Sequence, residues 1–343
     1  MARFRHRGGA PHHTLSNAGS YLLDLQDKLG GTVPAERFMQ EALYNPAFGY
    51  YSSRIRTVGR RGDFSTWATL DSSLSLGIAT WIKKEKPSHV IEIGAGNGAL
   101  AKDVLRRLGW WTRLRTTYHI VEISAPLRAK QKECLRGFRV VWHDSVEAAL
   151  QSSRGHAHIF SNELPDAFPC RIFQKTEAGW MELHLRIAEG KISEQLIPAT
   201  LPESSIFDHP HPIGQRVEIH ESYRRWLESW GQGWISGAIL TMDYGDLSKT
   251  LYHRRPAGSL RGYAVQQRLA GIEAFQNPGL CDITADVNFS DLEKWGTDLG
   301  WKTESHITLT DFLNQQGAVG SLPMAFREAG EAFRALIQRR SNK

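Results

Sequence analysis

The sequence has few cysteines and no long apolar segment. Its three cysteines, Cys134, Cys170 and Cys281, are odd in number and widely spaced, which excludes a disulfide framework and a paired zinc motif. No apolar run approaches the roughly 20 residues of a membrane span, and the N-terminus lacks the apolar core of a secretory signal. These absences predict a soluble protein of a reducing compartment, without a membrane span or a bound metal.

The body of the chain also lacks net charge. The formal net charge is +6; residues 1–23 hold three arginines and no acid, and residues 327–343 hold five bases and two acids, so the two ends account for all of it. Because nucleic-acid binding draws most of its affinity from clustered positive charge, we expect no nucleic-acid partner. A denser basic stretch from Lys102 to Arg139, with ten bases and three acids, is interpreted as a solvated helix surface.

Residues 1–20 contain Arg, His and Ser but no acid, a composition shared by transit peptides and disordered tails. We interpret them as a flexible basic tail. This interpretation predicts a bacterial cytoplasmic protein. The alternative, in which the segment is a transit peptide, predicts the mitochondrial matrix.

Residues 21–85 are predicted to form an N-terminal helical cap with a lid loop. Apolar residues recur at helical spacing in 21–29, 35–43 and 71–84. Between these helices, residues 44–51 and 59–66 are rich in glycine, turn formers and aromatics. Such loops either wrap a ligand or pack as a surface hairpin.

From residue 89 onward, strand and helix patterns alternate. Repeated strand–helix units predict an α/β fold with a mostly parallel sheet that is covered on both faces. We assign residues 86–169 and 235–343 to this Rossmann-like domain. Residues 170–234 interrupt the strand–helix alternation, and we assign them to an inserted α+β lobe that binds the substrate. Strands are expected at 90–93, 118–122, 140–142, 158–160, 238–245 and 301–309, and helices at 99–108, 125–135 and 146–150.

A glycine-rich turn joins the first of these strands to its helix. It runs Glu92-Ile93-Gly94-Ala95-Gly96-Asn97-Gly98, and its glycines let backbone approach a ligand while helix N–H groups point at it. Gly94, Gly96 and Ala99 also satisfy the dinucleotide pattern, so the turn alone leaves NAD and S-adenosylmethionine (SAM) open.

Carboxylates after neighbouring strands favour SAM as the ligand of this Rossmann-like domain. Glu92, inside the first strand, would oppose a pyrophosphate but suits a ligand with an ammonium and a sulfonium. Glu122, after the second strand, is placed for ribose hydroxyls, a feature that NAD enzymes share. Asp144, after the third, is placed near an adenine amino group, or else is a solvated loop residue.

Asn162, Glu163 and Asp166 follow the fourth strand, at the edge where open parallel sheets bind substrates. Two carboxylates and an amide at a strand end can orient a nucleophile against a methyl donor. Alternatively, Asp166 caps the next helix and Asn162 forms a turn.

Together these motifs resemble the MidA-type class I SAM-dependent methyltransferases, a family that includes the arginine methyltransferase of mitochondrial complex I assembly. The resemblance runs from about residue 35 to 317. The matching motifs are Tyr44-Asn45-Pro46, Gly49-Tyr50-Tyr51, Gly62-Asp63-Phe64 with Thr66, Glu92–Gly98, Val121–Ser124, Asn162-Glu163 with Asp166-Ala167, Asp243-Tyr244-Gly245 and Asp282–Ala285.

The resemblance implies SAM as cofactor, a class I methyltransferase fold with a cap and an inserted lobe, and methylation of a protein arginine, as in a complex I subunit. It implies that Gly62, Asp63, Phe64, Thr66 and Ile123 also bind SAM, with residues 62–64 closing as a lid. Asn162, Glu163, Asp166 and Asp63 are then the candidate catalytic residues.

The acceptor side departs from the family pattern more than the donor side does. Gln266, Asp286 and Asn288, and Leu309-Thr310 replace residues that are usual in the family. A SAM-binding assembly chaperone without catalysis therefore stands as an alternative, and the dinucleotide pattern leaves an NAD-dependent oxidoreductase as another. The sequence leaves homodimerisation open.

Overall fold

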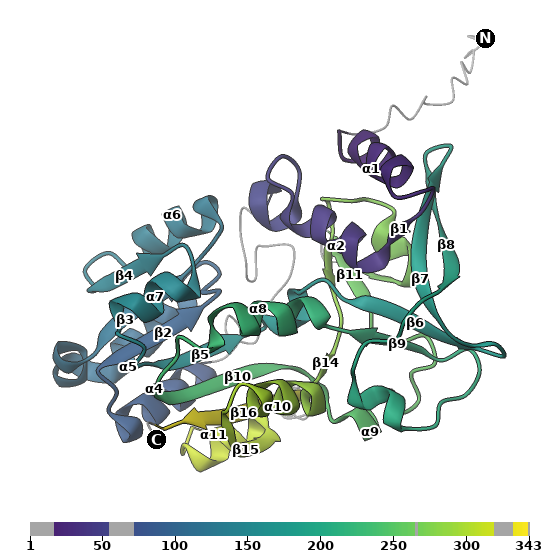
Figure 1. Ribbon diagram of the computed structural model, residues 1–343. Helices are drawn as coiled ribbons and strands as arrows, with labels where there is room; N and C mark the ends of the chain where they lie inside the picture. Colours follow the sequence, from purple (N-terminus) through teal and green to yellow (C-terminus); the bar gives the residue numbers. More distant parts are fainter. Residues whose placement is uncertain (1–16, 55–71, 265–266, 319–331, 342–343) are drawn as a thin grey trace, which may run out of the picture.

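The computed structural model in Figure 1 describes residues 17–54, 72–264, 267–318 and 332–341. The expected lid, with Gly62, Asp63, Phe64 and Thr66, and the departure at Gln266 lie outside these residues. None of the described helices is long and apolar enough to cross a bilayer.

The larger sheet follows the order β15-β16-β10-β5-β2-β3-β4, and the short β14 (Val287–Asn288) also pairs with β10. Neighbours from β4 through β10 run parallel, whereas β16 is antiparallel to both β10 and β15. The predicted parallel strands are therefore present. Their bounds are β2 His89–Ile93, β3 Thr117–Val121, β4 Val140–His143, β5 His158–Asn162, β10 Gly237–Asp246, β15 Lys302–Thr308 and β16 Phe333–Arg340.

Helices cover both faces of this sheet (Figure 1). On one face, α4, α5 and α11 bury side chains such as Ile78, Val104 and Phe312 against the strands. On the other, α7, α8 and α10 contribute residues such as Leu150 and Trp230. Their bounds are α4 Ser73–Glu85, α5 Ala99–Arg115, α6 Ala125–Cys134, α7 Val146–Ser152, α8 Glu221–Gly231, α9 Ser248–Leu251, α10 Phe289–Asp298 and α11 Leu309–Gln315.

A second layer of strands lies beside the carboxyl ends of the parallel strands (Figure 1). It contains a sheet in the order β1-β7-β6-β9, with β8 on β7, and a smaller sheet in the order β12-β11-β13. Phe38 and Met39 of α2 share one buried cluster with Leu185 of β7 and Ile283 of β13. The bounds are α1 Asn17–Lys28, β1 Val33–Pro34, α2 Ala35–Tyr44, β6 Arg171–Thr176, β7 Gly179–Ala188, β8 Lys191–Pro198, β9 Arg216–Ile219, β11 Arg261–Ala264, β12 Gln267–Ala270 and β13 Asp282–Thr284.

The structure differs from the sequence-based assignment in three places. Strands β11–β13 were assigned to the Rossmann-like part but pair with each other, apart from the larger sheet. Helix α8, assigned to the inserted lobe, packs Tyr223 and Leu227 into the cluster that covers the larger sheet. Strand β15 was expected to be the last strand, but β16 follows it and lies between β15 and β10.

Candidate functional site

A cavity of about 1030 Å³ opens where the carboxyl ends of β2, β3, β4 and β5 meet the second layer of strands. The turns after these four strands form one wall. The turn η2 (Pro165–Ala167) and the end of β10 continue this wall, and the opposite wall comes from α2, β11 and β13. The site residues predicted from the sequence that line it are Gly94, Gly96, Glu122, Ile123, Asp144, Asn162, Glu163 and Asp166.

The glycine turn requires a backbone that side chains disfavour. Gly94, Gly96 and Gly98 have φ values of 72°, 53° and 83°, in the left-handed region that glycine tolerates best. Gly94 and Gly96 line the cavity. Gly98 instead precedes α5, where an added Cβ would lie 3.3 Å from the Cα of Gln131, so it permits close packing of α5 on α6.

Glu92 lies away from the cavity wall. Its neighbour Ile93 lines the cavity, and because successive side chains of a strand point to opposite faces, Glu92 projects into the other, covered face of the sheet. There the Tyr118 hydroxyl donates a hydrogen bond of 2.6 Å to its carboxylate. Burial raises the pKa of Glu92 to about 7. Glu92 is thus not among the residues that line the cavity, and its predicted contact with a cationic ligand stays a prediction.

Glu122 is held in place at the end of β3. One carboxylate oxygen accepts the Ser124 backbone N–H at 2.8 Å, and the other accepts Gln131 Nε2–H at 2.9 Å. Gln131 also donates to the carbonyl of Gly96 at 2.8 Å, so one side chain ties the glycine turn to Glu122. Burial raises the pKa of the Glu122 carboxyl, and these hydrogen bonds oppose that rise.

Two neighbours of Glu122 lie on the exposed rim of the cavity. Ile123 is 68% exposed, so its side chain can cover a ligand from outside. Asp144 is also largely exposed and forms an ion pair with Arg128, whose guanidinium also donates to the Glu122 carbonyl. Arg128 thereby links the turns after β3 and β4.

Replacing Glu122 with alanine is expected to weaken SAM binding about ten- to hundred-fold, because the ligand loses a charged hydrogen-bond acceptor. Glu122→Gln removes the charge but can still accept the hydrogen bond from the Ser124 N–H. Comparing the two variants therefore separates the effect of the charge on SAM binding from the effect of losing this local hydrogen bond. Calorimetric titration measures the affinity, and thermal unfolding of both variants shows whether the fold persists. Unchanged affinity in a folded Glu122→Ala variant would remove this residue from the donor site.

Asn162 is the last residue of β5, and Glu163 follows it with an unusual backbone. Glu163 has φ +52°, a left-handed value that is uncommon outside glycine and concentrates at functional sites. Asn162 Nδ2–H donates to Glu163 Oε1 at 3.2 Å, whereas Asn162 Oδ1 is buried and has no hydrogen-bond partner among the described residues. A buried oxygen without a donor, on the cavity wall, fits a ligand that brings its own N–H or O–H group.

Asp166 and Asp243 form a buried pair of acids. Asp243 Oδ2 accepts the backbone N–H of Asp166 at 3.1 Å, and its other oxygen accepts the N–H of Tyr244 at 2.8 Å. Burial raises the pKa of both carboxyls well above the usual range; the nearby Glu163 carboxylate raises that of Asp166 further, and Asp166 raises that of Asp243. Asp166 does not cap a long helix, as the alternative interpretation supposed, but lies in the short turn η2 (Pro165–Ala167) and lines the cavity.

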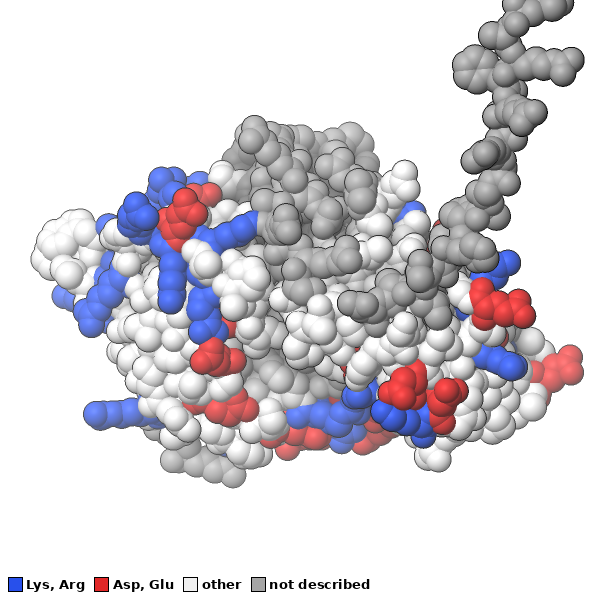
Figure 2. Space-filling model, turned by 90° about the horizontal axis from the view of Figure 1, so that it is seen from above, with Lys and Arg blue, Asp and Glu red and all other residues white. Residues whose placement is uncertain are grey.

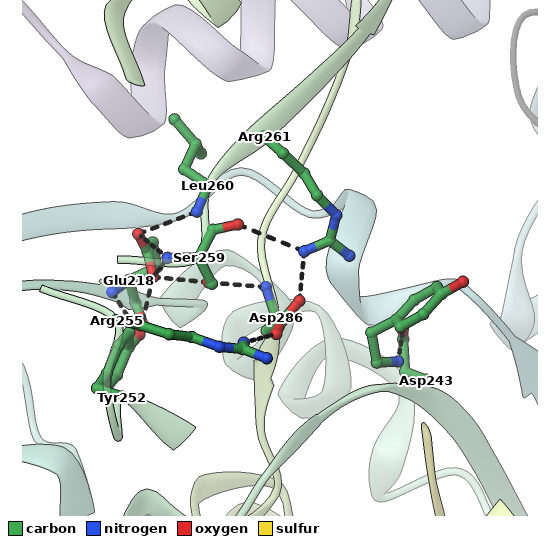
Figure 3. A network of polar contacts seen from close by, with 9 residues as sticks. Glu218, Asp243, Tyr252, Arg255, Ser259, Leu260, Arg261 and Asp286 are labelled. Atoms are coloured by element: carbon green, nitrogen blue, oxygen red, sulfur yellow. Dashed lines mark hydrogen bonds and ion pairs between the residues drawn. The ribbon is translucent and has the colours of Figure 1, made fainter. Parts of the chain in front are cut away.

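The opposite wall holds residues to which sequence reasoning gave no role. Arg261 lines the cavity and forms an ion pair with the buried Asp286, which also pairs with Arg255 (Figure 3). Ser259 accepts the N–H of Asp286 at 2.9 Å and donates to the carboxylate of Glu218 at 2.8 Å. This network holds Arg261 in the cavity wall. Asp286, which departs from the family pattern, thus has a structural role as the ion-pair partner of Arg261.

Tyr51 and Asp282 complete this wall. The Tyr51 hydroxyl donates to Asp282 Oδ1 at 2.6 Å, and the Tyr44 hydroxyl donates to the carbonyl of Ala167 at 2.9 Å. Tyr44 and Tyr51 stack with ring centroids 5.4 Å apart. The aromatic motif near residue 50 is therefore part of the cavity wall.

The described cavity wall carries a strong excess of acid. Among its residues only Arg261 is a permanent cation, whereas Glu122, Asp144, Glu147, Glu163, Asp166 and Asp282 are acids. Acidic groups gathered in a cavity with partly apolar walls raise the local concentration of cations. These residues fit SAM, which carries an ammonium, a sulfonium and ribose hydroxyls.

Comparisons with known proteins agree with this assignment. Residues 74–307 match the model of a family described as "Putative S-adenosyl-L-methionine-dependent methyltransferase". The chain is 29% identical to a zebrafish (Danio rerio) protein named protein arginine methyltransferase NDUFAF7, mitochondrial, over 93% of this chain and 81% of that protein. The human protein of that name is 28% identical, over 78% of this chain and 66% of its own length.

A solved structure has the same overall architecture. It belongs to a COG1565 superfamily member and likely methyl transferase from Burkholderia thailandensis, bound to S-adenosyl-homocysteine. The TM-score is 0.81, with 25% identity, and the match covers 94% of this chain and 92% of that one.

Proposed function

Since the chain belongs to the MidA-type family of S-adenosyl-L-methionine-dependent methyltransferases, we propose that it methylates an arginine side chain of a protein. SAM is its cofactor. The fold that we infer is the class I methyltransferase fold, with a cap from the N-terminal segment and a lobe inserted after β5. The sheet order β15-β16-β10-β5-β2-β3-β4, with parallel strands on one side and the antiparallel β16 on the other, supports this inference.

The excess of acid around the cavity is the observation that carries the arginine proposal. A guanidinium keeps its positive charge in water, because its pKa exceeds about 12. Glu163 and Asp166 lie on the cavity wall after β5, and Asp282 lies on the opposite wall. Burial and the charge of Glu163 together raise the pKa of Asp166, and a cationic side chain that enters between these walls would offset both effects.

In the proposed mechanism, residues of this chain position the substrate guanidinium and accept its proton. SAM supplies an electrophilic methyl group on its sulfonium. Glu163 and Asp166 hold the guanidinium so that one nitrogen faces the donor, and most of the acceleration comes from this orientation. The nitrogen that gains the methyl group must lose a proton, and a buried carboxylate with a raised pKa, such as Asp166, is a suitable acceptor. Asn162 helps to orient Glu163.

Several finer assignments are also proposals. The family resemblance suggests a respiratory complex I subunit as the substrate. Asp63 is proposed to assist Glu163, and Gly62, Phe64 and Thr66 to close over SAM. The names of the relatives place those proteins in mitochondria, so the mitochondrial matrix remains beside the bacterial cytoplasm as a proposed location.

Loss of a methyl mark in a deletion strain tests the proposed substrate. Mass spectrometry of proteins from the parent and the deletion strain should show an arginine that is methylated only in the parent. Restoring the gene should restore the mark, and restoring a Glu163→Gln version should not. Unchanged complex I peptides together with a lost mark elsewhere would keep the arginine activity and reject the complex I substrate.

Ligand titration separates the enzyme from the two alternatives. We expect calorimetry to detect SAM binding and no NADH binding. Tight SAM binding without transfer of label to lysate proteins would support the assembly chaperone, and binding of NADH alone would support the oxidoreductase.

A further inference from the structure

The C-terminal end of α5 carries an exposed apolar patch formed by Trp110, Trp111 and Leu114. These side chains are 56%, 61% and 67% exposed. The two tryptophan rings stack on each other, with centroids 3.8 Å apart. Contiguous exposed apolar residues mark interaction sites more often than single ones do.

The backbone itself turns this patch outward. Gly109 interrupts α5 with φ 74° and ψ 167°, so residues 110–115 begin a new helical turn in another direction. Trp110, Trp111 and Leu114 are spaced by three and four residues and so share one face of this turn. The segment ends at β3, so the patch lies at the amino ends of the parallel strands, at the opposite edge of the sheet from the cavity.

Arginines surround the patch. Arg113 and Arg115 lie on the same helical turn, and Arg136 and Arg139 follow α6. The guanidinium of Arg113 lies 5.2 Å from the ring centre of Phe138, which places the two segments side by side. Within the described residues, none of these four arginines has a carboxylate partner, and residues 104–121 and 134–143 contain no acid. Figure 2 shows Lys and Arg gathered at this end of the molecule, where α6 lies.

We propose that this patch docks on an anionic lipid bilayer surface. Tryptophan is the residue that favours the membrane interface most, and Leu114 adds aliphatic area beside the rings. The unpaired arginines match the negative charge of the lipid phosphates. A second copy of the chain fits less well, because a two-fold contact at this patch would bring the arginines of both copies together.

This docking leaves the cavity accessible. Because the patch and the cavity lie at opposite edges of the sheet, the cavity would face away from the bilayer. The proposal is independent of the arginine activity. The proposal gives a role to part of the basic stretch from Lys102 to Arg139, which was interpreted from the sequence as a solvated helix surface.

Vesicle binding by the full chain tests the proposal. We expect cosedimentation with vesicles of phosphatidylcholine that contain about one-third phosphatidylserine, weak binding to phosphatidylcholine alone, and loss of binding as salt rises. Trp110→Ser with Trp111→Ser is expected to lower the partition coefficient about tenfold or more. Arg115→Gln and Arg139→Gln are each expected to lower it about fivefold at low salt.

Ile213→Ser is the matched control, because Ile213 is also 67% exposed but lies in the loop before β9. It should bind vesicles as the parent does. Brominated lipid should quench the fluorescence of the parent and not that of the double tryptophan variant, and SAM affinity should be equal in all variants. Absence of binding to anionic vesicles, or equal binding by the tryptophan variant, would overturn the proposal. So would a dimer in sedimentation velocity that the tryptophan variant loses, because a second copy would then cover the patch.

Discussion

Replacing Glu163 with glutamine is expected to reduce methyl transfer about a hundred-fold or more, while SAM affinity changes by no more than a few-fold. Glutamine keeps the size of the side chain and can still accept the hydrogen bond from Asn162 Nδ2–H. What it loses is the charge that would hold a guanidinium opposite the methyl donor. A group that acts mainly in the transition state lowers turnover and leaves donor binding nearly unchanged.

Glu189→Gln is a close control for this variant. Glu189 also has a left-handed backbone, with φ 50°, but it is exposed in the turn between β7 and β8. Transfer rates from single-turnover experiments should fall in Glu163→Gln and remain at the parent value in Glu189→Gln. If Glu163→Gln retained full transfer, the catalytic assignment would pass to Asp166 or Asp63.

Gly96→Val is expected to abolish SAM binding. Gly96 lines the cavity in the turn after β2, where backbone and ligand would meet without an intervening side chain. A branched side chain there occupies ligand space. It also opposes the φ of 53°, since valine rarely adopts left-handed backbone. We expect a loss of about 1–2 kcal/mol of stability from this strain, which leaves the protein folded at low temperature.

Gly271→Val is a control that introduces the same backbone strain as Gly96→Val without placing a side chain in the cavity. Gly271 has φ +54°, and an added Cβ would meet no atom within 4 Å. Both variants should therefore lose similar stability in thermal unfolding, but only Gly96→Val should lose SAM binding in calorimetry. Normal SAM affinity in a folded Gly96→Val variant would mean that the glycine serves the packing of strand and helix alone.

The part of the site formed by the carboxyl ends of the parallel strands could be predicted from the sequence. Gly94, Gly96, Glu122 and Asn162 lie at or just after the carboxyl ends of strands in a parallel sheet, and these ends meet at one edge of the sheet whatever loops follow them. The same alternation rule could have shown that Glu92 faces away, because Ile93 adjoins the glycine turn and takes the cavity side.

The opposite wall of the cavity could not be predicted from the sequence. Arg261 and Asp286 are 25 residues apart in sequence and meet through β11, β13 and the turn that follows, which no short periodicity predicts. Strand β16 was missed because Arg334, Arg339 and Arg340 make its ends polar, although Ala335 and Leu336 between them are buried. Its position between β15 and β10 depends on pairings with distant strands, and a short local pattern does not encode these.

Identification of the methylated amino acid shows whether this chain transfers methyl groups to arginine. Purified protein would be incubated with SAM labelled in its methyl group and with lysate proteins, and the products would be hydrolysed to amino acids and separated. We expect the label to elute with methylated arginine, and we expect Glu163→Gln to yield almost none of it. Label in another amino acid, or SAM binding without any transferred label, would mean that the protein is not an arginine methyltransferase.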